Sequence, residues 1–210
     1  MPYILNVPYA DKDQAKELGA FWNTVLKKWV IPDHIKDINR FQKWISVESY
    51  SCIIRKPYLL ALSTRECWKC NKEIPVVAPG ALNYYYLDDA DEDHPDDNAL
   101  IWLKGESPTL FSDVEYLDPM MVEYLQEHYP FYKYTYSKFI DSSYWANTCK
   151  FCGVLQGDNF LHDEPGGSFC PTEYDPVAVK IISIDLDYDP VISGSYGGSQ
   201  AEDIDFLSGE

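Results

Sequence analysis

Short apolar runs separated by Pro, Gly and Asp recur along the chain and predict a fold richer in strands than in helices. Over residues 1–57 the pattern predicts a small βαββα module. Gly19 lies where a helix needs a left-handed C-terminal residue, which supports the first helix. The predicted elements are a strand at 3–7, a helix at 11–19, a hairpin that turns near Asn23, and a helix at 37–45.

After residue 57 the apolar runs are those of a mainly β domain. Asp118 followed by Pro119 is typical of a capped helix start and predicts one helix that ends near His128. The stretch YKYTYSKFI alternates in the way of a half-buried strand. Strands are predicted in the apolar runs at 58–68, 73–79, 82–87, 99–103 and 177–186. The fold class is therefore α+β.

The charge divides the 210 residues unevenly. Residues 1–57 carry nine basic and six acidic side chains, a balance of +3, whereas residues 58–210 carry eight and 28, a balance of −20. This change, together with Pro57, predicts a boundary between a 1–57 module and a 58–184 domain. Residues 185–210 are rich in Gly, Ser and acid and are predicted to be a mobile acidic tail. A second acidic run, residues 88–97, is predicted to be a loop.

A formal net charge of −17 argues against a protein that holds nucleic acid with its main surface, because such proteins neutralise phosphates with Lys and Arg. No apolar run reaches the roughly 18 residues of a membrane span. The first residues lack the features of a signal peptide. We therefore expect a cytoplasmic protein with no membrane association.

Four of the six cysteines form two C-x-x-C pairs, which we call the first knuckle (residues 67–70) and the second knuckle (149–152). Residues that tolerate a left-handed conformation, Asn71 and Gly153, follow them, as a tight thiolate turn requires. Two such turns supply a closed tetrahedral zinc site. The predicted zinc ligands are Cys67, Cys70, Cys149 and Cys152.

The 78 residues between Cys70 and Cys149 predict a zinc ribbon that is split by a large folded insertion, residues 71–148. One alternative is that both pairs are simply buried thiols. Another ligand set, Cys149, Cys152, His162 and Cys170, would leave the first knuckle unexplained. Cys52 has no partner by spacing and is expected to be a small buried residue.

The segment LNVPYADKDQAKELGAFWNTVLKKWVIP resembles the small module of unknown function found in TraC-type plasmid primases and related plasmid-transfer proteins. The shared features are a strand ending in VP, an AK-LGA helix end, a Trp, and KKW followed by Pro. The resemblance covers about the first 45 residues and implies a plasmid, phage or other mobile-element setting. It implies no activity, since the catalytic domains of the primases have no counterpart here.

The segment CGVLQGDNFLHDEPGGSFCP resembles a stretch of uncharacterised bacterial proteins that join a C-x-x-C-G knuckle to a QGD-F-LH-EPGG-F run. Pro165, Gly166 and Gly167 predict a tight turn. Four polar residues then fall beside the metal site. They either bond exposed backbone around the knuckle or form a ligand-binding patch: Gln156, Asp158, His162 and Glu164.

Motifs for catalysis are scarce. The sequence has no phosphate-binding loop, dinucleotide fingerprint, nucleophile elbow or H-E-x-x-H helix. His162-x-Glu164 near a C-x-x-C pair has the residue types of a zinc deaminase, but in reversed order and without an open zinc position. Neither acidic run has the Gly that an EF-hand loop requires.

These observations predict a non-enzymatic, zinc-stabilised acidic protein that binds another protein, such as an immunity protein or inhibitor for a basic effector. The first alternative is an accessory factor of plasmid or phage DNA processing that contacts nucleic acid only through its N-terminal module. The second is a zinc enzyme that uses His162 and Glu164.

Overall fold

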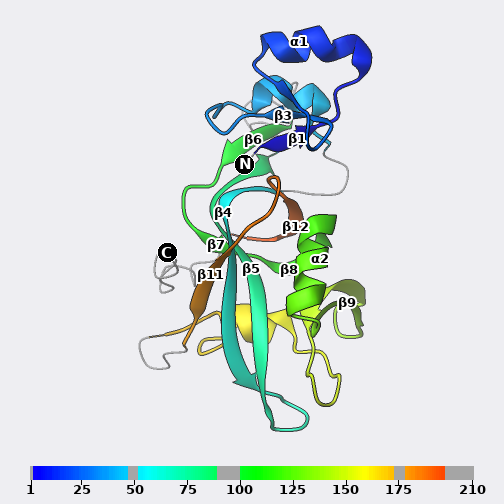
Figure 1. The fold of residues 1–210 in the computed structure, drawn as a ribbon. Coiled ribbons are helices and arrows are strands. Elements are labelled where there is room, and N and C mark those ends of the chain that lie inside the picture. Colours follow the sequence, from blue (N-terminus) through cyan, green and yellow to red (C-terminus); the bar gives the residue numbers. More distant parts are fainter. Residues whose placement is uncertain (1, 47–51, 89–99, 173–177, 197–210) are drawn as a thin grey trace.

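The computed structural model describes residues 2–46, 52–88, 100–172 and 178–196 and has a strand-rich α+β fold (Figure 1). The N-terminal module forms a three-stranded antiparallel sheet in the order β1-β3-β2. Its elements are β1 (Tyr3–Leu5), η1 (Tyr9–Asp11), α1 (Lys12–Glu17), β2 (Phe21–Asn23), β3 (Lys28–Ile31) and η2 (Asn39–Trp44).

The second helix predicted for the module is a 3₁₀ helix, η2, rather than an α-helix. Side chains bind it to neighbouring segments. The amide of Asn39 donates to the carbonyl of Trp102 (2.9 Å) and accepts from its N–H (2.7 Å). The Trp44 indole donates to Asp11 (2.9 Å). These side-chain contacts hold η2 in place, so it does not need the hydrogen bonds of a regular α-helix.

The rest of the chain forms a large antiparallel sheet in the order β6-β5-β4-β12-β8-β10-β9, with β11 paired to β4 and β7 to β5. One helix, α2 (Pro119–His128), begins as predicted, with the Asp118 side chain accepting from the N–H of Met120 (2.9 Å). The strands are β4 (Cys52–Glu66), β5 (Glu73–Asp88), β6 (Ile101–Lys104), β7 (Thr109–Leu110), β8 (Ser112–Leu117), β9 (Tyr132–Ser137), β10 (Ser142–Asn147), β11 (Lys180–Ile184) and β12 (Val191–Ser195).

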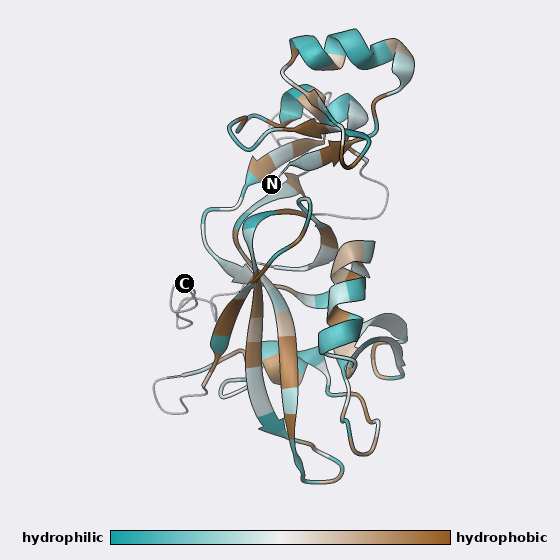
Figure 2. Ribbon diagram, in the orientation of Figure 1, coloured by the Kyte–Doolittle hydropathy of each residue, from teal (hydrophilic) through white to brown (hydrophobic). Residues whose placement is uncertain are grey.

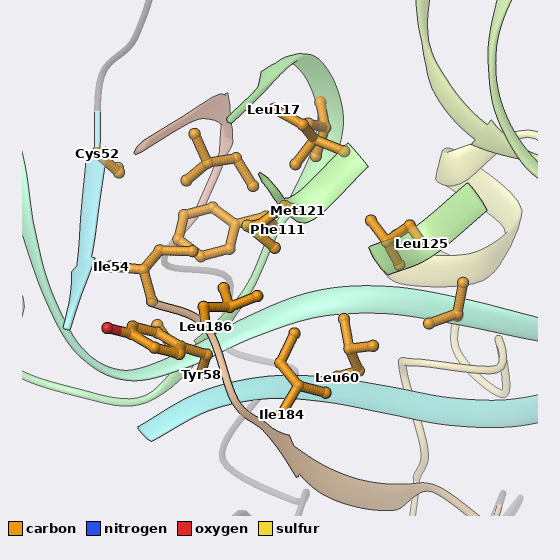
Figure 3. Packing of buried hydrophobic residues seen from close by; sticks show 14 of the residues in the cluster. Cys52, Ile54, Tyr58, Leu60, Phe111, Leu117, Met121, Leu125, Ile184 and Leu186 are labelled. Atoms are coloured by element: carbon orange, nitrogen blue, oxygen red, sulfur yellow. The ribbon is translucent and has the colours of Figure 1, made fainter. Parts of the chain in front are cut away.

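The long hairpin of β4 and β5 runs along the length of the molecule (Figure 1). Apolar clusters lie on both of its faces. The buried even-numbered residues of β4 enter the main core, where Ile54 and Leu60 lie in one cluster with Met121 and Leu125 of α2 (Figure 3). Odd-numbered ones, such as Leu59, enter a second cluster. Where both faces are covered, at residues 58–62 (YLLAL), the strand sequence is continuously apolar.

The N-terminal module packs against one end of this hairpin, and we call that contact the module seam. Ile53, Tyr85, Trp102 and Val191 of the large sheet lie in one cluster with buried residues of the module. Figure 2 shows α1, at the outer side of the module, as mostly hydrophilic. The module therefore turns its apolar side to the large sheet.

Three predicted boundaries need correction. β4 includes Pro57, so residues 52–57 belong to the large sheet and not to the small module. Residues 71–148 provide β5 to β10 and α2, so they build the large sheet itself and are not a separate insertion. Residues 185–196 are not a mobile tail, because β12 pairs with β4 and β8 and because Asp189 is buried.

The last correction has a physical reason. Residues 185–196 are acidic, but they include the apolar strand β12 and a carboxylate that is paired with a basic side chain. Asp189 accepts a hydrogen bond from the Tyr58 hydroxyl (2.7 Å) and lies 3.0 Å from Nε of Arg55. Most of the predicted acidic loop, residues 89–97, and the end of the predicted tail, residues 197–210, lie outside the described residues.

Candidate metal centre

Four cysteines meet at the end of the hairpin that is remote from the module seam. Cys67 and Cys70 lie in the turn between β4 and β5, and Cys149 and Cys152 follow β10. Their four sulfur atoms all lie within 4.8 Å of one another, an arrangement that could hold a metal ion. The two knuckles, 78 residues apart in the sequence, are therefore brought together as predicted.

The two knuckles have the same backbone geometry. In the first, the Cys67 N–H donates to the carbonyl of Lys72 and the Asn71 N–H to that of Cys67, both at 2.9 Å. In the second, the N–H groups of Cys149 and Gly153 make the equivalent bonds at 2.8 Å. Asn71 and Gly153 have φ values of 56° and 71°, which confirms the left-handed residue predicted after each pair.

Two close sulfur contacts run between the knuckles. Cys67 Sγ lies 3.7 Å from Cys152 Sγ, and Cys70 Sγ lies 3.7 Å from Cys149 Sγ. All four thiols are free of disulfides. The sulfurs thus occupy the corners of one small polyhedron to which each knuckle contributes two.

Hydrogen bonding prepares the first thiol of each knuckle for ionisation. Burial disfavours the Cys67 thiolate, but the N–H groups of Cys70 and Lys69 and neighbouring thiols donate to its sulfur and lower its pKa to about 6. Burial opposes ionisation of Cys149 as well, yet N–H donors lower its pKa too. The Phe151 N–H, 3.4 Å from the Cys149 sulfur, is one of them.

Cys70 behaves in the opposite way. The N–H of Lys72 favours its thiolate, but burial and the three neighbouring sulfurs outweigh that donor and raise its pKa to about 11. Four thiolates cannot coexist at these separations without a cation between them, because like charges disfavour each further ionisation.

Neighbouring side chains hold the two knuckles against each other. The Trp68 indole donates to the Leu155 carbonyl (2.8 Å). The Gln156 amide donates to the Val154 carbonyl (3.1 Å) and lies 3.6 Å from the Cys67 sulfur. Lys72 Nζ lies 4.5 Å from the centre of the Phe151 ring, so that a cation–π contact also joins the two knuckles.

A buried asparagine anchors the second knuckle. No sequence motif marks this residue. Asn147 is 1% exposed, and its amide both accepts from the N–H of Val77 and donates to the carbonyl of the same residue, each at 2.9 Å. The side chain thus acts as a short strand partner for β5. Its only signal in the sequence is a polar residue at the end of a β-prone run, two positions before Cys149.

The four predicted patch residues have different surroundings. Gln156 is fully buried at the metal centre, Asp158 accepts from the N–H of Asp113 (2.9 Å), and Glu164 is exposed. His162 packs against Phe169, with ring centres 4.9 Å apart. Gln156 and Asp158 therefore bond backbone groups, which is the first of the two roles that the sequence predicts for these residues.

Burial sets the protonation of the two titratable patch residues that lie inside. Burial raises the pKa of Asp158 to about 8, with the nearby Asp113 and Asp163 adding to the effect and the Asp113 N–H opposing it. Burial lowers the pKa of His162 to about 4. At neutral pH Asp158 is therefore mostly protonated and His162 is neutral.

The predicted turn at Pro165–Gly167 closes a short π-helix, η3 (Asn159–Asp163). Gly166 has a φ of 82°, and a side chain on Gly167 would meet three backbone carbonyl oxygens at 2.8 Å. Glycine is thus required at Gly167 by the close approach of η3. The turn positions Phe169 beside Leu161 in the core.

The two remaining cysteines lie outside the four-sulfur group. Cys52 is fully buried in the main core, as expected, and Cys170 is 5% exposed. Within the described part of the chain the only group of three or more His, Cys, Asp or Glu residues placed to hold a metal is the four-cysteine set. The rival ligand set with His162 and Cys170 is therefore not assembled.

Comparison with known proteins agrees with the small module at the N-terminus. A family model described as a domain of unknown function (DUF5710) matches residues 3–46, the segment that folds as β1 to η2. Searches of the curated proteins and of the solved structures returned no match. None of the helices in the described ranges is both long and apolar enough to span a bilayer. The N-terminal segment of this chain thus matches a small domain whose function is not defined.

Proposed function

We propose that the protein is a non-enzymatic binding protein whose hairpin tip is stabilised by one zinc ion bound to Cys67, Cys70, Cys149 and Cys152. The observation that carries this proposal is the 3.7 Å separation of sulfurs across the two knuckles. A tetrahedron with zinc–sulfur bonds of about 2.3 Å has edges of about 3.8 Å. Four thiolates fill such a site and leave no position for a substrate, so its role is structural.

Metal analysis tests the zinc assignment directly. Protein purified without a chelator is expected to contain one equivalent of zinc. Cys67→Ser and Cys149→Ser should lose it, whereas Cys170→Ala should keep it. Less than about half an equivalent of zinc in the wild-type protein would contradict the proposal. If the protein showed the absorbance of an iron–thiolate centre, the bound metal would be iron, which four thiolates also bind.

The charge of the chain supports a basic protein as the partner. Residues 58–210 have a balance of −20, and complementary charge speeds association and excludes acidic competitors. An immunity protein or inhibitor for a basic effector is the class that fits this chemistry. The acidic runs would then contact the basic partner. The setting would be a bacterium or a mobile element.

A pull-down with the full chain from its source cell tests this role. We expect one stoichiometric partner of basic isoelectric point, released by moderate salt. The matched comparison is a chain truncated after residue 196, which keeps β12 and therefore the sheet. It should bind the partner less tightly and still contain zinc. Recovery of no stoichiometric partner would count against the proposal.

A groove in the N-terminal module favours a second candidate, an accessory factor of mobile-element DNA processing. A pocket of about 410 Å³ is lined by Trp22, Lys27, Lys28 and Trp29 among other residues. The two indoles form an edge-to-face pair at 6.0 Å, and Trp22 is 48% exposed. Exposed aromatic rings beside lysines are the groups that bind single-stranded nucleic acid.

Fluorescence anisotropy of a labelled single-stranded oligonucleotide tests this candidate with the full chain. Binding that weakens with salt and is lost in Trp22→Ala and Lys28→Gln, but not in Lys133→Gln on the exposed side of β9, would support it. Absence of salt-sensitive binding would dismiss it. A zinc enzyme that uses His162 and Glu164 has less support, because His162 packs against Phe169 while Glu164 is exposed.

A further inference from the structure

A pocket of about 350 Å³ opens beside the module seam, on the large sheet. Four basic side chains line it, and Asp33 is the only acidic lining residue among those described, in a chain whose net charge is −17. Two carboxylates outside the lining, Asp189 and Asp185, pair with Arg55 and Lys56. The lysines and arginine come from three segments of the chain, since two of them are neighbours in β4: Lys36, Arg55, Lys56 and Lys104.

The register of the large sheet explains why these residues meet. Arg55 of β4 is paired with Asn83 of β5, and Tyr85 of β5 is paired with Lys104 of β6. Directly opposed residues and residues two apart on one strand share a face of the sheet. Arg55, Asn83, Tyr85 and Lys104 therefore point to the same side, where the Tyr85 hydroxyl donates to the Lys36 carbonyl (2.8 Å).

Arg55 is held rigidly at the base of the pocket. Its side chain is only 11% exposed, with Nε 3.0 Å from the buried Asp189 carboxylate and Nη2 3.4 Å from Asp33. Its Nη1 is buried and has no hydrogen-bond partner among the described residues. A guanidinium fixed in this way is already oriented for an anion and loses little freedom when one binds.

The lysines around Arg55 are only weakly compensated. Lys36 Nζ donates to the backbone carbonyl of Asp33 (3.1 Å), which carries no formal charge. Lys56 Nζ lies 3.7 Å from Asp185, whose side chain is 93% exposed, so that this ion pair is screened by solvent. The pocket thus gathers four cations, of which Arg55 and Lys56 already pair with carboxylates, while Lys36 and Lys104 remain for an anionic ligand.

We propose that this pocket binds the phosphate group of a small phosphorylated ligand. Arginine and lysine side chains converging from several segments are the groups that recognise phosphate. The volume suits a small molecule, since ligand pockets begin at about 300 Å³. The ligand would contact both the N-terminal module, through Lys36, and the large sheet.

Isothermal titration calorimetry with the zinc-loaded full chain tests the proposal, using inorganic phosphate, pyrophosphate and AMP as probes. We expect binding of at least one probe that weakens with salt. The double variant Lys36→Gln with Lys104→Gln should weaken it at least tenfold, while Lys133→Gln, which removes the same charge type from β9, should leave it unchanged. Both pocket lysines are exposed, so the variant should unfold at the same temperature as the wild type.

The probes also separate the two sources of a phosphate group. Tighter binding of AMP than of inorganic phosphate would identify a phosphate ester, and equal affinity would identify a site for the phosphate group alone. No binding of any probe at millimolar concentration would overturn the proposal. Equal weakening by the double variant and by Lys133→Gln would overturn it as well, because the effect would then be one of net charge.

Discussion

The two ends of the β4–β5 hairpin are fastened by different physical means. At the module seam, thirteen buried apolar residues form one cluster that joins the N-terminal module to the large sheet. At the metal centre the corresponding cluster contains three, and two of those are cysteines: Cys67, Ile74 and Cys149. Apolar burial of that size cannot offset the conformational entropy of ordering two turns.

The contrast teaches where a metal is needed in a fold of this size. The seam has enough buried area to hold itself together by the hydrophobic effect. The hairpin tip has little apolar burial of its own, so a metal ion bound to the four sulfurs would contribute most there. Both ends nevertheless share one device, an asparagine amide that pairs with both backbone groups of one residue: Asn39 with Trp102 and Asn147 with Val77.

Removal of the metal is the change with the largest expected effect. Cys67→Ser, or a strong chelator, should reduce the free energy of unfolding by more than about 5 kcal/mol, because binding of a structural zinc is coupled to folding. Hydrogen exchange should show lost protection around residues 64–76 and 147–156, while residues 3–45 keep theirs. Equal loss of protection at the seam would show that the two ends are not independent.

The reverse change is Trp102→Ala at the seam. The side chain is 2% exposed, and its indole N–H has no hydrogen-bond partner in the described part of the chain, so the loss is one of packing. We expect a destabilisation of about 3–5 kcal/mol by urea unfolding. The zinc content should stay at one equivalent. A variant that also lost its zinc would contradict the comparison between the ends.

The shared asparagine device allows a matched pair of variants. Asn147→Ala leaves the buried N–H and carbonyl of Val77 unpaired and should cost about 2 kcal/mol. Asn39→Ala should cost about 1 kcal/mol, because the Trp102 backbone groups lie in a partly buried place. Thermal unfolding of both variants measures the difference. A larger cost for Asn39→Ala would mean that burial does not set the strength of the device.

The last prediction concerns pH. Asp158 has a pKa of about 8 in the folded protein and an ordinary carboxyl pKa when unfolded, so the folded state holds the extra proton between these values. Stability from this group is present at low pH and falls by about 1.4 kcal/mol per pH unit as the pH rises towards 8. Asp158→Asn should remove that slope, and the exposed Asp163→Asn should not.

Features set by local chemistry were predictable from the sequence. The cysteine pairs, with Asn71 and Gly153 behind them, specify a turn whose geometry depends on six adjacent residues. The start of α2 is equally local, since Asp118 and Pro119 cap it by themselves. Such features need no knowledge of the rest of the fold.

Features that depend on distant partners were not predictable. The acidic composition of residues 185–196 indicates a tail, yet Asp189 is buried because Arg55 and Tyr58 compensate it from the other end of the sequence. Asn147 bonds a backbone 70 residues away and leaves no periodic trace. From the sequence Asp158 would be taken for a surface carboxylate, because none of its neighbours in the chain indicates that it is buried.

The stiffness of the β4–β5 hairpin has a consequence for recognition. At about 3.3 Å per residue, the stretch from Arg55 to Glu66 sets the phosphate pocket and the metal centre about 35 Å apart. A partner that contacted both would gain avidity only if its own two contact points were spaced to match. A partner that bound both sites would therefore have to match this spacing as well as the charge of each site.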